Sequence, residues 1–228
     1  IFRKSFPRVE EQRVKNIGLT LKILFDNRPK MQIIATGSSS YELANKLNEP
    51  LTGRSLEFKL FPLSITEILE EKPGYQIEGQ RLLPRLLKYG SYPKIFKSPE
   101  IGIEDRLEGL TNQYLYKDVL MLGSVQKPEI LPKLLKAVAL QVGSELNINK
   151  LSNNLDVDKG LVQRYLDILE KAFIIFRLDS YSSNQYKEIR RNKKFYFWDI
   201  GIRNAVLKYY PDIDLGLNLG GLWENFLI

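Results

Sequence analysis

The chain has 228 residues and a formal net charge of +7, with 43% hydrophobic and 27% charged residues. These values are typical of a globular protein with one large core or two small ones. It contains no cysteine and no histidine, which excludes disulfides, thiolate zinc sites, histidine-based metal sites and nucleophiles activated by histidine.

The sequence also limits where the protein is expected and what it binds. No apolar run reaches the length of about 18 residues that a membrane helix needs, and there is no N-terminal signal pattern, so we expect a cytoplasmic protein without a membrane partner. The excess of Lys and Arg favours an anionic partner such as nucleotide or nucleic acid, and solvated surface charge explains it equally well. The chain begins at Ile1 rather than at Met, and residues 223–228 resemble the start of an apolar helix rather than a tail. We therefore expect a fragment.

The first 63 residues indicate an open α/β sheet. Apolar residues at helical spacing predict a helix over 17–27, and the apolar run 31–36 is typical of a buried parallel strand. A short helix over 41–47 and an alternating strand over 55–63 follow. Strand, loop, helix and strand in this order predict an α/β fold.

The remainder is predicted to be mainly helical. Helices are expected over 65–71, 80–89, 104–122 and 129–142. A compact unit follows, with helices over 148–154 and 160–172 and strands over 173–178 and 194–198. Helix, turn, helix and β-hairpin in this order are the outline of a winged helix.

Two features of this unit are expected to be structural. The apolar side of its second helix should form the core, with Leu161, Tyr165, Leu166, Leu169 and Phe173. Asp199 follows the second strand and is expected to cap the helix after it. A nuclease would need several carboxylates gathered around a metal, and the sequence shows no such group.

Glu10 is the first candidate for chemistry. In P-loop ATPases an acidic residue at the end of a strand polarises the attacking water, and an acid before it helps to hold Mg²⁺. Here Val9 occupies the preceding position. An ordinary charged loop is the alternative interpretation.

Ser38 and Arg54 are the second and third candidates. Ser38 follows the predicted strand 31–36, at the edge where open α/β sheets bind ligands, and would contact the γ-phosphate or the attacking water. Helix capping is the alternative. Arg54 follows Gly53 in a turn, which is typical of an arginine that neutralises phosphate charge, with a plain surface arginine as the alternative.

Basic residues gather within the winged-helix outline. The second helix carries Lys159, Gln163 and Arg164, and the loop at the expected wing carries Arg190, Arg191, Lys193 and Lys194. These groups would meet DNA phosphates, whereas the acidic residues Asp167 and Glu170 would be repelled. A protein-docking or purely structural role stays open beside DNA binding.

Several strings follow one another in a defined order. They are Glu10-x-Gln12-Arg13-Val14, Thr36-Gly37-Ser38-Ser39, Gly53-Arg54, Phe61-Pro62-Leu63-Ser64, Tyr89-Gly90-Ser91-Tyr92-Pro93, Tyr114-x-x-x-Asp118, 162–170, 196–204 and Trp223-Glu224-Asn225-Phe226. Together they resemble the prokaryotic AAA+-type ATPases that end in a C-terminal domain of unknown function. The resemblance covers nearly the whole chain.

The resemblance implies ATP and Mg²⁺ as cofactors, with Glu10 as the catalytic acid and Ser38 as the sensor. It divides the chain into the C-terminal half of an ATPase domain (1–72), a helical connector (73–128), a winged-helix domain (129–221) and the start of a nuclease-like region (222–228). Two departures count against hydrolysis by this chain alone. It contains no G-x-x-x-x-G-K-[ST] loop, and Val9 replaces the family's Asp.

Two functions are therefore expected. The first is ATP-dependent switching in the whole protein, coupled to DNA or to a partner protein, with this chain inactive alone. The alternative is a non-enzymatic DNA- or protein-binding module that has lost nucleotide binding. The sequence predicts neither the metal ligands nor the oligomeric state.

Overall fold

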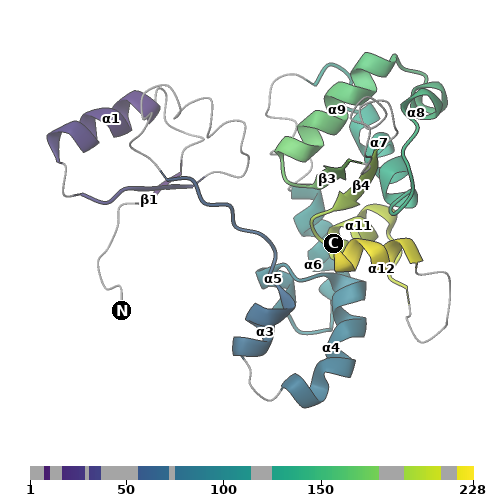
Figure 1. Ribbon diagram of the computed structural model, residues 1–228, viewed down its shortest axis with the longest axis horizontal. Coiled ribbons are helices and arrows are strands. Elements are labelled where there is room, and N and C mark those ends of the chain that lie inside the picture. Colours follow the sequence, from purple (N-terminus) through teal and green to yellow (C-terminus); the bar gives the residue numbers. More distant parts are fainter. Residues whose placement is uncertain are drawn as a thin grey trace, which may run out of the picture. The chain divides into compact units, whose positions relative to one another are not determined.

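The computed structural model describes residues 8–10, 17–28, 31–36, 56–71, 75–113, 125–179, 193–211 and 220–228 (Figure 1). The chain divides into two compact units, residues 1–60 and residues 61–228. The described part is mostly helical with two small two-stranded sheets, so the chain is α/β in general terms. The four-part division expected from the sequence stays a prediction. No described helix is long and apolar enough to cross a membrane.

The first unit contains β1 (Arg8–Glu10), α1 (Ile17–Asn27) and β2 (Ile34–Thr36). The two strands are parallel neighbours, with Arg8 opposite Ile34 and Glu10 opposite Thr36. Parallel neighbours need a crossover between them, and α1 lies in that connection. The helix has the predicted bounds, whereas the strand is the second half of the predicted 31–36. The helix predicted over 41–47 lies outside the described residues.

The strand predicted over 55–63 is wrong for the residues that the structure describes. Residues 56–63 lie in no helix and belong to neither described sheet. Leu56, Phe58 and Leu60 are 86%, 81% and 96% exposed. Alternation of apolar residues indicates an extended chain, but a strand also needs a neighbour for its N–H and C=O groups.

The second unit begins with four helices. They are α3 (Ile65–Glu71), α4 (Tyr75–Tyr89), α5 (Pro93–Phe96) and α6 (Ile103–Gln113). Ser64 and Glu67 form a capping box at the start of α3, because the Ser64 Oγ accepts from the Glu67 N–H and the Glu67 carboxylate accepts from the Ser64 N–H. Compared with the prediction, α4 begins five residues earlier, and residues 114–122 of the predicted 104–122 lie outside the described part.

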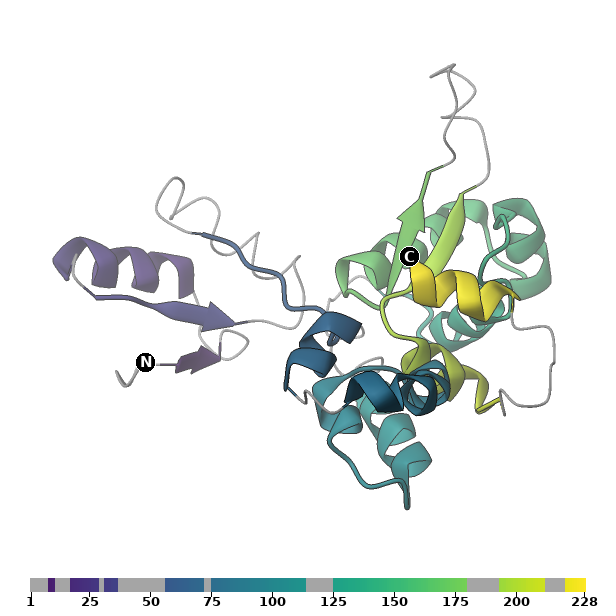
Figure 2. The same cartoon turned by 60° about the horizontal axis from the view of Figure 1, so that its bottom comes forward.

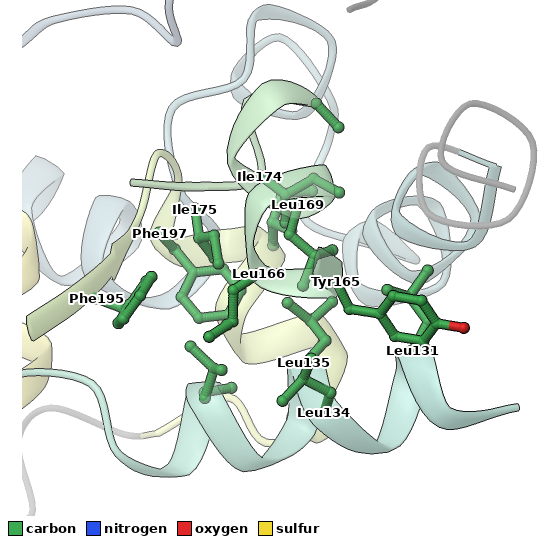
Figure 3. Close-up of a cluster of buried hydrophobic side chains, with 14 of the residues drawn as sticks. Leu131, Leu134, Leu135, Tyr165, Leu166, Leu169, Ile174, Ile175, Phe195 and Phe197 are labelled. Carbon is green, nitrogen blue, oxygen red and sulfur yellow. The ribbon is translucent and has the colours of Figure 1, made fainter. Parts of the chain in front are cut away.

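A continuous apolar core follows in the second unit. It joins α7 (Ile130–Leu140), α8 (Ile148–Leu155), α9 (Lys159–Lys171), β3 (Ile175–Leu178) and β4 (Lys194–Phe197). Figure 3 shows Leu131, Leu134 and Leu135 of α7 facing the side chains of α9. Of the predicted core residues, Leu161, Tyr165, Leu166 and Leu169 are buried and Phe173 is half-buried.

The second sheet is a short antiparallel hairpin. Ile175 of β3 lies opposite Phe197 of β4, and Leu178 lies opposite Lys194. On the other side of β4, Glu145 forms a bridge with Lys194, and the Leu146 N–H donates to the Lys193 carbonyl. The chain between α7 and α8 therefore adds a third short neighbour to the hairpin.

Helix α12 (Gly220–Leu227) lies beside β4 (Figure 2). The side chain of Asn225 attaches it to that strand. The Asn225 Oδ1 accepts from the Phe197 N–H, and its Nδ2 donates to the Phe197 carbonyl, both at 2.8 Å. The neighbouring Glu224 carboxylate accepts from Lys194 and from the Tyr196 hydroxyl. This amide therefore bonds to β4 as the backbone of another strand would.

Helices α4 and α11 (Ile200–Leu207) pack at very close range. A Cβ built on Gly201 would lie 2.1 Å from the Tyr89 carbonyl oxygen, so only glycine fits there. The Asn204 Nδ2 donates to the carbonyls of Leu87 and Lys88, which are the free acceptors at the end of α4.

Asp199, at the start of α11, connects the same two helices. Its Oδ1 accepts from the Ile202 N–H at 3.0 Å, which confirms the predicted cap of α11. Its Oδ2 accepts from the Ser91 N–H at 2.7 Å, immediately after α4. Gly90 has a φ of +75°, and a Cβ there would lie 2.2 Å from the Asp199 carboxylate. Burial raises the pKa of Asp199 to about 6, against the backbone N–H donors that lower it.

We predict that Asp199 makes stability depend on pH. Because its pKa in the folded state lies above the ordinary 3.8, its contribution is fully present below pH 3.8 and is lost as the pH rises through about 6. That loss is on the order of 3 kcal/mol. In Asp199→Asn, which also loses the bond from Ser91, this pH dependence should disappear.

Urea unfolding of the wild type and Asp199→Asn between pH 4 and pH 7 measures this difference. The free energy of unfolding of the wild type should exceed that of Asp199→Asn most at pH 4, and this difference should shrink as the pH rises. Asp158→Asn, the same change at the exposed cap of α9, is the matched control. Parallel stability curves for the wild type and Asp199→Asn would contradict the assignment.

A second prediction concerns the attachment of α12. Asn225→Asp replaces the amide that donates to the Phe197 carbonyl by an acceptor, and should lower the free energy of unfolding by about 2–3 kcal/mol. Asn149→Asp, in the exposed first turn of α8, is the control and should be close to neutral. Denaturant unfolding at neutral pH measures both, and an Asn225→Asp stability equal to that of the wild type would show that the bond to the Phe197 carbonyl contributes nothing.

Candidate functional site

The carboxyl ends of β1 and β2 form the first candidate site. Glu10 ends β1 and Thr36 ends β2, and the two residues are opposite one another in register. This edge is where ligands of open α/β sheets bind. The backbone register therefore puts Glu10 beside the last residue of β2, and its catalytic role stays a prediction. Ser38 and Arg54 lie outside the described residues, and their roles stay predictions.

The residues at this edge do not by themselves fit ATP and Mg²⁺. The sequence has no phosphate-binding loop, and Val9 stands before Glu10. Within the described residues no three acidic side chains gather in a way that could hold a metal ion. What this edge offers is one acidic position next to a strand that ends in the hydroxyl residue Thr36.

The exposed side of α9 is the second candidate. Its three predicted residues, Lys159, Gln163 and Arg164, are all exposed and lie within about one and a half turns of one another. Leu161, Val162 and Tyr165 on the opposite side are buried in the core shown in Figure 3. Burial of that side fixes the direction in which the basic residues point. The structure therefore brings these three candidates together.

The acidic half of α9 is neutralised from β3. The Arg177 Nε donates to Glu170 at 2.6 Å, and the same guanidinium pairs with Asp167. Hydrogen bonding to Glu170, followed by that to Asp167, raises the pKa of Arg177 above its ordinary value. This role of Arg177 was not predictable from the sequence, because nothing in the spacing of Asp167, Glu170 and Arg177 indicates how the hairpin packs on the helix.

Two basic residues predicted for the wing have partners within the chain. The Lys193 Nζ lies 2.6 Å from the Asp179 Oδ1, and the Lys194 Nζ lies 2.7 Å from the Glu224 Oε1. The hydrogen bond from Lys194 is the main reason why the pKa of Glu224 is lowered. Arg190 and Arg191 lie outside the described residues. A phosphate contact by this loop stays a prediction.

Comparison with known proteins connects the first candidate site to a domain type. Residues 10–69 match a family model described as an AAA domain. This match supports a nucleotide-binding, ATPase-like fold in this part of the chain. No solved structure matches the chain.

Relatives occur in bacteria and archaea. An uncharacterized protein of Haemophilus influenzae is 30% identical over 185 residues, which are 77% of this chain and 46% of that protein. An uncharacterized protein of Mycobacterium tuberculosis is 28% identical over 225 residues, 96% of this chain and 48% of that protein. One from Methanocaldococcus jannaschii is 24% identical over 225 residues, 86% of this chain and 47% of that protein.

The chain spans about half the length of the curated relatives it matches. A second family model, described as a domain of unknown function (DUF8612), matches residues 80–212. This range includes α6, α7, α8, α9, both strands of the hairpin and α11. Since the match covers more than half of the chain, the protein belongs to the DUF8612 family.

Proposed function

We propose that this chain is part of an AAA-type ATPase whose second unit binds the backbone of duplex DNA. The AAA-domain match over residues 10–69 supports the first half of the proposal. One observation carries the second half: Lys159, Gln163 and Arg164 are exposed together at the start of α9, and among the described residues neither cation forms an ion pair.

The element order supports a winged helix as the DNA-binding module. Helix α7, the bridge at Glu145, helices α8 and α9, and the β3–β4 hairpin follow one another along the chain. In winged helices and related helix-turn-helix domains, the second helix of the turn approaches the DNA groove. Helix α9 occupies that position in the order.

Charge on α9 favours an anionic partner. Lys159 lies in its first turn, where the positive end of the helix dipole adds to its charge, and Arg164 lies one turn further along. Asp167 and Glu170 would repel DNA, but Arg177 compensates part of their charge. Long cationic side chains of this kind meet phosphates rather than base edges. We therefore expect weak binding that tolerates any sequence and decreases steeply with salt.

For the first unit, we infer that Glu10 polarises a water molecule beside a nucleotide whose phosphates are held by residues outside this chain. Ser38 would contact the γ-phosphate or that water, and Arg54 would neutralise phosphate charge. Nucleotide binding would then switch the arrangement of the whole protein, and the second unit would couple this switch to DNA.

A protein-docking or structural role is the second candidate for the α7–β4 unit. The observation that favours it is the pairing of Lys193 with Asp179 and of Lys194 with Glu224, which occupies two cations of the expected wing. Under this alternative the unit would bind no duplex DNA even at low salt.

The DNA proposal predicts a specific change in salt dependence. Replacing both Lys159 and Arg164 by Ala removes two phosphate contacts, so the log–log slope of affinity against salt should fall in magnitude by about 1.8. Stability should change by less than about 0.5 kcal/mol because both side chains are exposed. Fluorescence anisotropy with a labelled duplex at several salt concentrations measures the slope.

The matched control is the double variant Lys94→Ala and Lys97→Ala. It removes the same charge at exposed positions of the α5 region, where Lys97 also loses its ion pair with Glu71, and should keep the wild-type slope. A wild-type chain that binds no duplex at low salt would favour the docking alternative. If the α9 variant still binds DNA with an unchanged salt slope, Lys159 and Arg164 do not contact the phosphates.

The missing phosphate-binding loop predicts weak nucleotide binding by this chain alone. Without the nested backbone amides and the Lys of that loop, ATP with Mg²⁺ should bind no tighter than about millimolar. Isothermal titration calorimetry measures this affinity. A micromolar dissociation constant would show that other residues of the chain hold the phosphates.

A further inference from the structure

The loop between α5 and α6, residues 97–102, presents an apolar side chain to solvent. Ile101 in this loop is 88% exposed. Single exposed apolar residues are common on protein surfaces, so the exposure of Ile101 is informative only together with the structure around it. Two further features of the second unit, a rigidly held loop and a mostly apolar hollow, give it that context.

Two arginines hold the loop in place. The Arg85 Nη2 donates to the Ser98 carbonyl at 3.0 Å, and its Nη1 pairs with Glu100 at 3.2 Å. From the other side, the Arg106 Nη1 donates to the Ile101 carbonyl at 2.7 Å. A group that is already ordered loses little conformational entropy when it binds. The loop therefore presents Ile101 as a preorganised apolar knob.

A hollow of about 260 Å³ lies between α6, α7 and α11. Its lining is mostly apolar, with contributions from Pro132, Leu135, Ala205 and Val206. A water molecule takes about 30 Å³ in the liquid, so the hollow has room for an aliphatic side chain. An apolar lining favours an apolar occupant, because a polar group would lose its hydrogen bonds to water there.

The charges beside the hollow are positive on balance. Lys133 and Lys136 line it from neighbouring positions on α7, and both are exposed. Neither forms an ion pair with any residue that the structure describes. Lys208 also lines the hollow, but its Nζ lies 3.0 Å from the Glu108 Oε2, so these two charges compensate each other.

The charges beside the knob are negative on balance. Glu104 and Asp105 follow Ile101 in the first turn of α6, and both are exposed. Neither forms an ion pair within the described part of the chain. Arg106 lies next to them, but its guanidinium donates to the carbonyls of the loop. The knob therefore has an acidic border, and the hollow has a basic one.

We propose that two copies of this chain form a symmetric dimer in which Ile101 of each copy fills the hollow of the other. The loop precedes α6, and the second half of the same helix lines the hollow. Asp105, Glu108 and Asn112 recur at spacings of three and four residues, so one side of α6 leads from the knob to the hollow.

This arrangement closes at two copies. When two α6 helices lie antiparallel, the knob of each copy reaches the hollow of the other, at contacts separated by about the 16 Å length of the helix. Both contacts are identical and related by a two-fold axis, which leaves no free knob or hollow for a third copy. In each contact, Glu104 and Asp105 approach the basic border of the other copy's hollow. The interface is small, so we expect a dissociation constant of about 10–100 µM.

Sedimentation velocity of the full chain over a series of concentrations measures the dimer. Ile101→Ser should raise the dissociation constant at least about tenfold, which corresponds to about 1.4 kcal/mol, because each dimer contains the residue twice. Leu227→Ser is the matched control. It makes the same kind of change at a position that is 66% exposed in α12, and should leave the dissociation constant at the wild-type value.

A charge swap tests how the two borders pair. One variant carries Glu104→Lys and Asp105→Lys, and the other carries Lys133→Glu and Lys136→Glu. Each variant alone should be monomeric, because like charges then meet at both contacts. An equal mixture of the two should form a mixed dimer, because both of its contacts again join opposite charges. Recovery in the mixture also shows that both variants are folded.

Three results would overturn the proposal. The first is a wild-type chain that stays monomeric up to about 1 mM, which would assign the hollow to a different occupant. The second is a dimer that Ile101→Ser leaves unchanged. The third is a mixture of the two charge variants that stays monomeric.

Discussion

The buried carboxylate of Asp199 is the contact on which the second unit depends. It follows β4 directly in the chain, caps α11 and accepts a hydrogen bond from the residue after α4. Helix α11 in turn packs on α4, α6 and α7. The side chain of Asp199 therefore connects the end of the hairpin to the start of α11 and to the end of α4. Gly90 is required because a Cβ there would meet the Asp199 carboxylate, and Gly201 because a Cβ there would meet the Tyr89 carbonyl.

Local patterns explain which parts of the fold could be predicted. Helices α1 and α3 have the predicted bounds and α9 differs by one residue at each end, because their apolar spacing and end signals lie within the helices or next to them. The strand over 55–63 failed because pairing depends on residues distant in sequence. Periodicity could show that 56–60 is extended, but it could not supply a neighbouring strand.

The candidate sites were predictable to different degrees for the same reason. No strand was predicted before Glu10, so its position opposite Thr36 became visible only with the pairing of β1 and β2. The exposure of Lys159, Gln163 and Arg164 follows from the apolar side of α9. The partners of the other charges did not follow, since Lys194 pairs with Glu224, 30 residues further along the chain. Charge patterns in a sequence therefore locate cations but do not show which of them remain free.

The Asn225 amide determines how much of the edge of β4 is open for pairing with other protein molecules. On the side of β4 away from β3, the bridge to Glu145 covers only the start of the strand, and Asn225 occupies both backbone groups of Phe197. An open strand edge is a template for pairing with the strands of other molecules. Helix α12 thus covers this edge of β4, and removing residues 220–228 would leave the Phe197 N–H and carbonyl open for pairing with a strand of another molecule.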